Sequence, residues 1–326
     1  MRQGGPESPI LFNLYVPFVM RSYIEKCNTI IEIKFYEHKY RIQSRAWSRK
    51  ERIDMRNHRL KSAGSSVLPW CGYADDLVLF LESRESLLNA TKLLDQVFKS
   101  FGLSINNSKT ETMILNTDND INSIISLRDK PLSNIDVFKY LGAYIDPRQP
   151  NTGDSEINHR IQMAQVKFAE MSNLLQNFHI NLRSRILFLN CYIRSRLTYA
   201  AQNWSLTTTQ FDRLDTTYRS FLRLMIRNGF KQVDRNSNDF RLIISNAQLH
   251  TICGTKDVSD FIKIQQRKYA SHVIRMPHDR TLKQLMFNDD KQLKRGRPTK
   301  TLLEQVVCDT NVTLDHFCNL SIGRKF

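Results

Sequence analysis

Residues 68–81 read LPWCGYADDLVLFL. Two apolar runs flank the pair Asp75-Asp76, which predicts a β-hairpin with both aspartates at its turn. Turns favour aspartate for local reasons, so an acidic pair alone is weak evidence of function. Two carboxylates held this close also repel each other, and a divalent cation that prefers hard oxygen ligands, such as Mg2+, relieves the repulsion. The hairpin is therefore a candidate metal site.

A helix is expected upstream of the hairpin. Ser8-Pro9 marks its start, because serine is a good N-cap and proline fits the first turn. Pro17 removes a hydrogen bond inside this helix at a cost of ~3 kcal/mol, so either the helix kinks there or this copy of the gene is damaged. The apolar residues that share one helical face are Ile10, Leu11, Leu14 and Phe18.

Downstream of the hairpin the sequence predicts one helix and several strands. Ser83 can cap a helix that Gly102 ends. Residues 103–105 and parts of 112–115 alternate apolar with polar positions, which predicts short strands. Residues 137–145, VFKYLGAYI, are predicted as one more strand.

The composition changes over residues 147–154, which are rich in Pro, Asn, Asp and Gly, and we expect a domain boundary there. Beyond it, apolar residues recur every three or four positions, as in amphipathic helices. These helical stripes cover residues 157–175, 186–197 and 211–225, and a further helix is expected over 258–275.

Charge points to a polyanionic partner. The chain has 326 residues, of which 48 are Lys or Arg and 32 are Asp or Glu, so its net charge is +16. Ten basic and three acidic residues lie between Lys34 and Lys61, with Tyr36, Tyr40 and Trp47 among them. Such a mixture suits phosphate contacts combined with stacking on bases. A solvated basic loop is the equally open alternative.

Two other basic features have the same two interpretations. Arg219, Arg223 and Arg227 are four residues apart and share one face of a predicted helix, which could follow a nucleic-acid backbone or simply be solvated. Residues 295–298, RGRP, resemble the core of an AT-hook, which binds narrow minor grooves. A solvated linker is the favoured interpretation of that short match.

The cysteines and the hydropathy indicate the cellular location. Six cysteines are scattered without a CxxC pair, which predicts reduced thiols and no zinc site. No stretch supplies the about 20 uncharged apolar residues of a membrane span, and no signal peptide is recognisable. We expect a protein of the nucleus or cytoplasm, not a secreted one.

Four motifs together carry a resemblance to a known family. Tyr73-Ala74-Asp75-Asp76 resembles motif C of reverse transcriptases. In the order of that family, residues 2–13 resemble motif B, residues 102–110 resemble motif D, and residues 138–142 resemble the primer-grip motif E. The details are those of non-LTR (LINE-type) retrotransposons. Leu197-Thr198-Tyr199 and Trp204 are similar to the thumb and downstream region of those proteins.

The resemblance implies catalytic roles for Asp75, Asp76 and Lys109 and a binding role for Tyr73. Asp75 would be the principal metal ligand and Asp76 its weaker partner. Tyr73 would pack beneath the primer terminus. Lys109 would lie near the triphosphate and could donate a proton to pyrophosphate, although a surface lysine is the alternative.

It also implies binding roles. Gln3 and Gly4 would lie against the template and the incoming nucleotide, where glycine allows a close backbone approach. The primer strand would be positioned by Tyr140, Leu141 and Gly142. The partners would be an RNA template, a DNA primer and deoxynucleoside triphosphates, and the duplex would be recognised by its A-form shape.

The family's third catalytic carboxylate belongs to motif A, upstream of motif B. Because motif B begins here at residue 2, we expect the fingers, the motif A strand and its aspartate to be missing, which leaves an unpaired strand edge. The expected fold is α+β: a partial palm over residues 1–148, a helical thumb over 149–230, and a helical basic C-terminal region over 231–326.

The implied function is RNA-directed DNA polymerisation with two Mg2+ ions, at a site that is incomplete in this chain. Little activity is therefore expected from the chain alone, and the missing N-terminal half of the same enzyme is a candidate partner. Two alternatives stay open: a non-catalytic nucleic-acid-binding remnant of the element, and a relic that does not fold stably.

Overall fold

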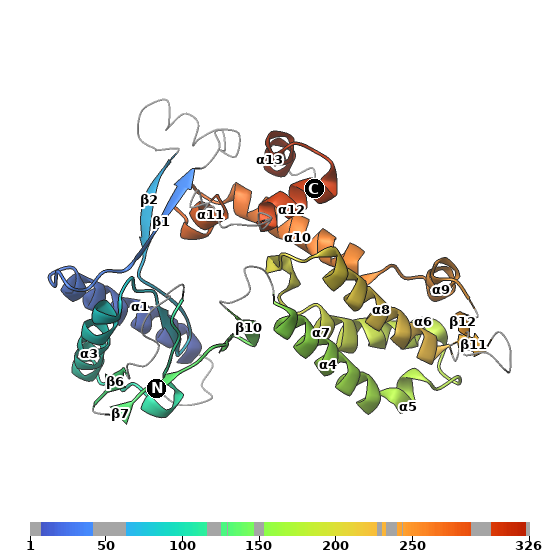
Figure 1. Ribbon diagram of the computed structural model, residues 1–326, viewed down its shortest axis with the longest axis horizontal. Coiled ribbons are helices and arrows are strands. Elements are labelled where there is room, and N and C mark those ends of the chain that lie inside the picture. The colour runs from blue at the N-terminus through green and yellow to red at the C-terminus, as the bar shows by residue number, and fades with distance from the viewer. Residues whose placement is uncertain are drawn as a thin grey trace. The chain divides into compact units, whose positions relative to one another are not determined.

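The computed structural model describes residues 8–41, 63–115, 125–128, 130–146, 153–226, 230–232, 240–242, 244–287 and 301–323. Helices and short two-stranded sheets make the chain an α+β protein, as predicted (Figure 1). Its contacts divide it into two compact units, which are described separately. Unit 1 comprises Met1–Ser44, Arg49–Asp136 and Pro277–Gln292, and unit 2 comprises Arg45–Ser48, Val137–Met276 and Leu293–Phe326. The predicted division at residues 148 and 230 stays a prediction.

Unit 1 is built on two helices, α1 (Ser8–Cys27) and α3 (Arg84–Ser100), whose apolar faces share one core. Ser83 caps α3 as predicted, accepting a hydrogen bond from the backbone N–H of Ser86 at 3.1 Å, and Gly102 follows the helix with a φ of 71°. The phenol of Tyr23 donates to the carbonyl of Ala90 at 3.1 Å and joins the two helices.

Helix α1 continues through Pro17 to Cys27. The face that it buries consists of Val16, Val19, Met20, Tyr23 and Cys27. The apolar stripe seen in the sequence lies outside this core, because Ile10, Leu11, Leu14 and Phe18 are all between 49% and 68% exposed. Periodicity identified the helix but did not identify the side that meets the core.

The predicted hairpin is present as β3 (Trp70–Tyr73) and β4 (Asp76–Leu79). Tyr73 pairs with Asp76, so the two-residue turn consists of Ala74 and Asp75, and Asp76 is the first residue of β4. Among the strands that the structure describes, β3 and β4 pair only with each other.

The remaining sheets of unit 1 are small. The antiparallel pairs are β1 (Tyr36–Arg41) with β2 (Ala63–Leu68) and β6 (Ser126–Leu127) with β7 (Lys130–Pro131); β5 (Glu111–Thr112) is parallel to β8 (Ser133–Asn134). Helix α11 (Thr281–Met286) also belongs to this unit. The strand predicted over residues 103–105 was wrong. Leu103 and Ile105 pack half-buried against the core without a partner strand, which produces the same alternation as a strand.

Unit 2 begins with a hairpin where one strand was predicted. Residues 138–145 form β9 (Phe138–Tyr140) and β10 (Ala143–Ile145), which pair antiparallel. The turn between them is Leu141-Gly142, with positive φ values of 48° and 80°. Turns with two positive φ values usually contain asparagine, aspartate or glycine at the first position. Leucine is rare there, so the sequence did not predict this turn.

The other described residues of unit 2 are mainly helical, with one short β-hairpin. Its helices are α4 (Asp154–Glu170), α5 (Ser172–Leu175), α6 (Leu182–Phe188), the π-helical η3 (Leu189–Arg194), α7 (Ser195–Leu197), η4 (Ala201–Asn203), α8 (Thr208–Met225), α9 (Asn246–Cys253), α10 (Val258–Arg275), α12 (Leu302–Thr310) and α13 (Leu314–Ile322). The hairpin pairs β11 (Phe230–Gln232) with β12 (Phe240–Leu242). The predicted helix over 258–275 is confirmed to the residue.

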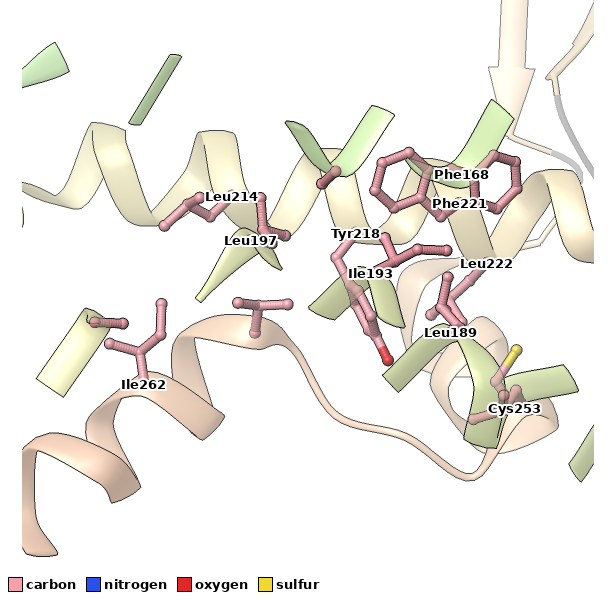
Figure 2. Packing of buried hydrophobic residues seen from close by; sticks show 14 of the residues in the cluster. Phe168, Leu189, Ile193, Leu197, Leu214, Tyr218, Phe221, Leu222, Cys253 and Ile262 are labelled. Carbon is pink, nitrogen blue, oxygen red and sulfur yellow. The ribbon is translucent and has the colours of Figure 1, made fainter. Parts of the chain in front are cut away.

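The core of unit 2 joins α4, η3, α8 and α10 (Figure 2). The rings of Phe168 and Phe221 stack there with centroids 4.7 Å apart. The C-terminal helices extend the same unit: Gln305 accepts a hydrogen bond from the backbone N–H of Leu206 at 3.0 Å, and the hydroxyls of Ser271 and Ser321 are 2.9 Å apart.

All six cysteines are free thiols. In the described part of the chain, no helix combines the length and the apolar character that crossing a membrane requires.

Candidate functional site

The acidic pair lies at the exposed tip of the β3–β4 hairpin. Ala74 has a φ of 52°, a left-handed conformation that turns the chain sharply and brings Asp75 and Asp76 to the end of the hairpin. Both aspartates are exposed, and the neighbouring Tyr73 is 68% exposed. The end of this hairpin therefore exposes two carboxylates and a phenol to solvent.

Gly72 explains how the hairpin stays tight beneath this tip. A Cβ atom at position 72 would lie 2.6 Å from Cδ2 of Leu77 and 3.0 Å from the ring of Trp70. Trp70 and Leu77 in turn pack against the core of unit 1. Glycine at position 72 therefore lets the side chains of Leu77 and Trp70 lie directly against the backbone of β3, where any larger residue would displace them.

The donor chemistry of the tip suits a divalent cation, because carboxylate oxygens are the ligands that Mg2+ prefers. A complete site needs more than these two groups. In the part of the chain that the structure describes, no three His, Cys, Asp or Glu side chains come together in a way that could hold a metal ion. Asp75 and Asp76 thus fit a metal as two of its ligands, but they do not make a closed site.

Lys109 lies on a separate turn of unit 1. It ends the 3-10 helix η2 (Asn107–Lys109), which Asn106 caps by accepting a hydrogen bond from the backbone N–H of Ser108 at 3.1 Å. The Lys109 side chain is exposed. Gln3 and Gly4, the two predicted contacts to template and nucleotide, lie outside the described residues, as does most of the basic segment after Arg41.

The predicted primer-grip residues lie at the β9–β10 turn of unit 2, and two side chains from the helical region hold this turn. The phenol of Tyr199 donates to the carbonyl of Leu141 at 2.7 Å, and the guanidinium of Arg160 donates to the carbonyl of Gly142 at 2.5 Å. Gly142 also faces the Tyr199 ring, which lies 3.6 Å from where its Cβ would be. Both carbonyls of the turn are therefore bound.

Arg160 is itself fixed by Glu156, one helical turn earlier on α4. Its Nε atom lies 2.6 Å from Oε1 of Glu156, and the two side chains are 9% and 2% exposed. The other carboxylate oxygen accepts the backbone N–H of Tyr144, in β10, at 2.8 Å. The guanidinium also lies 4.6 Å from the centroid of the Tyr199 ring. Glu156, Arg160 and Tyr199 are called the turn clamp below.

Our sequence reasoning assigned no role to Glu156 and Arg160. Their spacing of four residues was a usable signal for a helical ion pair. Nothing in that spacing indicated that the pair is buried or that it binds a hairpin.

The arginines predicted as a backbone-binding face make contacts within unit 2. Arg219 binds both carboxylate oxygens of Asp257 at 2.7 and 3.0 Å. Arg223 is 8% exposed and donates to the carbonyl of Ile244 and to Asn246 at 3.2 and 2.9 Å. Neither guanidinium is an unoccupied surface cation. Arg227 lies outside the described residues, as does the AT-hook-like segment 295–298.

The Arg219 contact has an electrostatic consequence. Burial alone would raise the pKa of Asp257, but the hydrogen bonds and charge of Arg219, with His250 adding to them, hold that pKa below its ordinary value. His250 completes the cluster, its Nε2 lying 2.9 Å from the same carboxylate. This ion-paired group joins α8, α9 and the residue that precedes α10.

The carboxylate hairpin lies within a segment that matches a known family. Residues 1–145 match the family model described as reverse transcriptase (RNA-dependent DNA polymerase). A transposon-derived protein of Caenorhabditis elegans is 22% identical to the chain over 206 residues, which cover 62% of this chain and 70% of that protein.

Proposed function

We propose that this chain, whose residues 1–145 form a reverse transcriptase domain of transposon origin, is the reverse transcriptase region of a non-LTR retrotransposon. Its reaction would be nucleotidyl transfer from deoxynucleoside triphosphates to a DNA primer on an RNA template. The observation that carries the proposal is the exposed end of the β3–β4 hairpin within the matched segment, where Asp75 lies in the turn and Asp76 begins β4.

Asp75 and Asp76 would hold Mg2+, with Asp75 as the principal ligand. In such a site the metal supplies activation of the primer 3′-hydroxyl and charge stabilisation of the leaving pyrophosphate. Tyr73, exposed beside the pair, would support the primer end. Lys109 is exposed, so a pyrophosphate leaving group could reach its side chain, and an ammonium there could donate the proton. Gln3 and Gly4 would contact the template and the nucleotide.

The chain alone is expected to polymerise weakly. Two-metal catalysis needs enough carboxylates to hold both ions, and the hairpin supplies two. A third carboxylate from outside the hairpin would complete the set. The turn clamp supports a primer-positioning role for the β9–β10 turn. It holds the carbonyls of Leu141 and Gly142 in one arrangement, against which a primer strand could be placed.

The test compares primer extension by the purified chain with extension by Asp75→Asn and by the control Glu82→Gln, an exposed acid of the same unit. We expect extension close to background in all three. Direct Mn2+ binding is the second measurement: it should be weak, lost in Asp75→Asn and kept in Glu82→Gln.

Two outcomes contradict parts of the proposal. Strong extension that Asp75→Asn abolishes would refute the incompleteness of the site while supporting the catalytic role of the aspartates. Mn2+ binding that Asp75→Asn leaves unchanged would remove the metal-ligand role of the hairpin.

A non-catalytic role in nucleic-acid binding is the second candidate, and the net charge of +16 favours it. Binding through phosphates weakens steeply as salt rises, because each neutralised phosphate releases counterions. Affinity for an RNA–DNA duplex should then fall with salt equally in the wild type and in Asp75→Asn. Salt-independent binding, or no binding, would exclude this candidate.

A further inference from the structure

An open pocket of about 330 Å3 lies in unit 1, away from the carboxylate hairpin in sequence. One wall is the η2 turn with the residue that caps it, and the other is the β6–β7 hairpin. The residues that line it are Ile105, Asn106, Asn107, Ser108, Arg128 and Lys130. None of the functional roles described above uses this pocket.

Two cations line the β6–β7 side. Arg128 binds Asp95 through its Nε atom at 3.0 and 3.1 Å and through Nη2, which leaves the N–H groups of Nη1 outside this ion pair. Lys99 also pairs with Asp95 at 2.8 Å, so the acid is neutralised twice. Lys130 is exposed on the neighbouring strand. Both charged residues among those that line the pocket, Arg128 and Lys130, are therefore cations.

The η2 side contributes a further donor. The Oδ1 atom of Asn106 accepts hydrogen bonds from both the backbone N–H and the hydroxyl of Ser108, at 3.1 and 2.7 Å. These bonds identify Oδ1 as the acceptor, so the remaining amide atom of Asn106 is the nitrogen, a donor. Arg128, Lys130 and Asn106 all line one pocket, and each carries a donor group that suits an anion.

The two walls are held at a fixed spacing. Asn107 donates from Nδ2 to the carbonyl of Leu127 at 2.7 Å and so joins the η2 turn to the β6–β7 hairpin. The pocket lining is thus built by specific contacts between residues about twenty positions apart in the chain.

Arg128 occupies a conformation that disfavours arginine. Its φ is 52°, at the first position of a two-residue hairpin turn where asparagine or glycine is usual. Backbone strain of this kind persists where the surroundings enforce it, and it gathers at ligand-binding sites. The bidentate pair with Asp95 enforces it here. The turn therefore keeps a guanidinium where a small residue would be easier to accommodate.

We propose that this pocket binds a phosphate group, with Arg128, Lys130 and Asn106 as its donors. The phosphate belongs either to a nucleic-acid strand or to a free nucleotide, and both present the same oxygens. The inference rests on the proposed function only in naming a nucleic-acid strand and a nucleotide as the two sources of the phosphate. It requires no catalysis and does not involve Asp75 or Asp76.

The test uses the full chain and two probes: inorganic pyrophosphate measured by calorimetry, and a short single-stranded DNA oligonucleotide measured by fluorescence anisotropy. Asn106→Asp keeps an acceptor for Ser108, and so keeps the cap, but replaces the donor with a negative charge. Lys130→Gln removes a cation. Lys92→Gln, an exposed lysine on α3, is the matched control. Thermal melting of each variant verifies the fold.

Asn106→Asp and Lys130→Gln should each weaken pyrophosphate binding about tenfold, whereas Lys92→Gln should change it less than about twofold. Equal weakening of oligonucleotide binding would identify a strand phosphate as the source, and weakening of pyrophosphate binding alone would identify a free nucleotide. Absence of pyrophosphate binding to the wild type, or unchanged affinity in Asn106→Asp, would overturn the inference. If either of these results is found while the variants still bind the oligonucleotide as tightly as the wild type does, the pocket inference fails but the proposed function stands.

Discussion

The phenolic hydroxyl of Tyr199 donates a hydrogen bond to the backbone carbonyl of Leu141, 58 residues away in the chain, at 2.7 Å. The acceptor is the first of two turn residues with positive φ, and the donor lies two residues after the end of α7. The conformation of the β9–β10 turn is thus supported from the helical region, through a contact that secondary structure alone does not imply.

Tyr199→Phe tests this bond. The substitution keeps the ring under the Arg160 guanidinium and removes only the hydroxyl. Because Tyr199 is 46% exposed, water replaces the lost partner, and we expect the free energy of unfolding to fall by only about 0.5–1 kcal/mol. Tyr192→Phe is the control, since Tyr192 is 49% exposed in the same unit. Urea denaturation measures both, and equal losses would argue against the bond.

A double-mutant cycle tests the buried pair of the turn clamp. Arg160→Met leaves the Glu156 carboxylate buried beside only the Tyr144 N–H, and a broken buried pair typically costs about 3–5 kcal/mol. Glu156→Gln should cost less, because its amide oxygen can still accept from Tyr144. The double variant should be more stable than the sum of the single losses predicts. Simple additivity in urea denaturation would show that the two side chains do not interact.

The two apolar faces of α1 should respond differently to truncation. Met20 is fully buried, so Met20→Ala should lower the free energy of unfolding by about 2–4 kcal/mol. Leu14 is 68% exposed, so Leu14→Ala should change it by less than about 0.5 kcal/mol. Both variants introduce the same residue into the same helix. The reverse ranking would mean that α1 buries its other face.

Acid should weaken unit 1 through Asp95. The hydrogen bond from Arg128 holds the pKa of this carboxylate below its ordinary value, and Lys99 contributes in the same direction. The lowered pKa stabilises the fold at any pH above the pKa of the unfolded chain, and this stabilisation is lost as the pH falls through the folded value. The window therefore runs downward from about pH 5.

Asp95→Asn provides the comparison. Its stability deficit relative to the wild type should be largest near neutral pH and should shrink as the solution is acidified. Urea denaturation at several pH values measures the deficit. A deficit that is constant with pH would show that ionisation of Asp95 makes no difference to the fold.

Local signals accounted for the parts of the structure that were predicted well. The Asp-Asp hairpin, the Ser83 cap of α3 and the bounds of α10 follow from turn residues, capping residues and periodicity, all of which act within a few positions. The roles assigned to Asp75, Asp76 and Lys109 came from family resemblance. The geometry adds to them only that Asp75 and Asp76 are both exposed at the end of one hairpin.

Long-range contacts account for the parts that were missed. Spacing by four put Arg219 and Arg223 on one face, but it could not indicate that Asp257 and Asn246 lie opposite that face. In the sequence, Leu141 resembles an ordinary strand residue. Its left-handed conformation depends on a contact with Tyr199, which the local sequence does not indicate. These errors share one cause: the deciding partner is distant in the sequence and has no motif of its own.

The π-helical segment η3, between α6 and α7, has a consequence for how this region tolerates insertions and deletions. A π-turn contains one more residue than an α-turn, so it acts as a single-residue insertion absorbed without breaking the helix. Deleting one residue from Leu189–Arg194 should therefore restore regular α-helical pitch with the following segment still on its original face. Tyr199 would keep its place beside Leu141. The same deletion inside the regular helix α4 would turn the residues after it by about 100° about the helix axis, so loss of one codon should disturb the β9–β10 turn less in η3 than in α4.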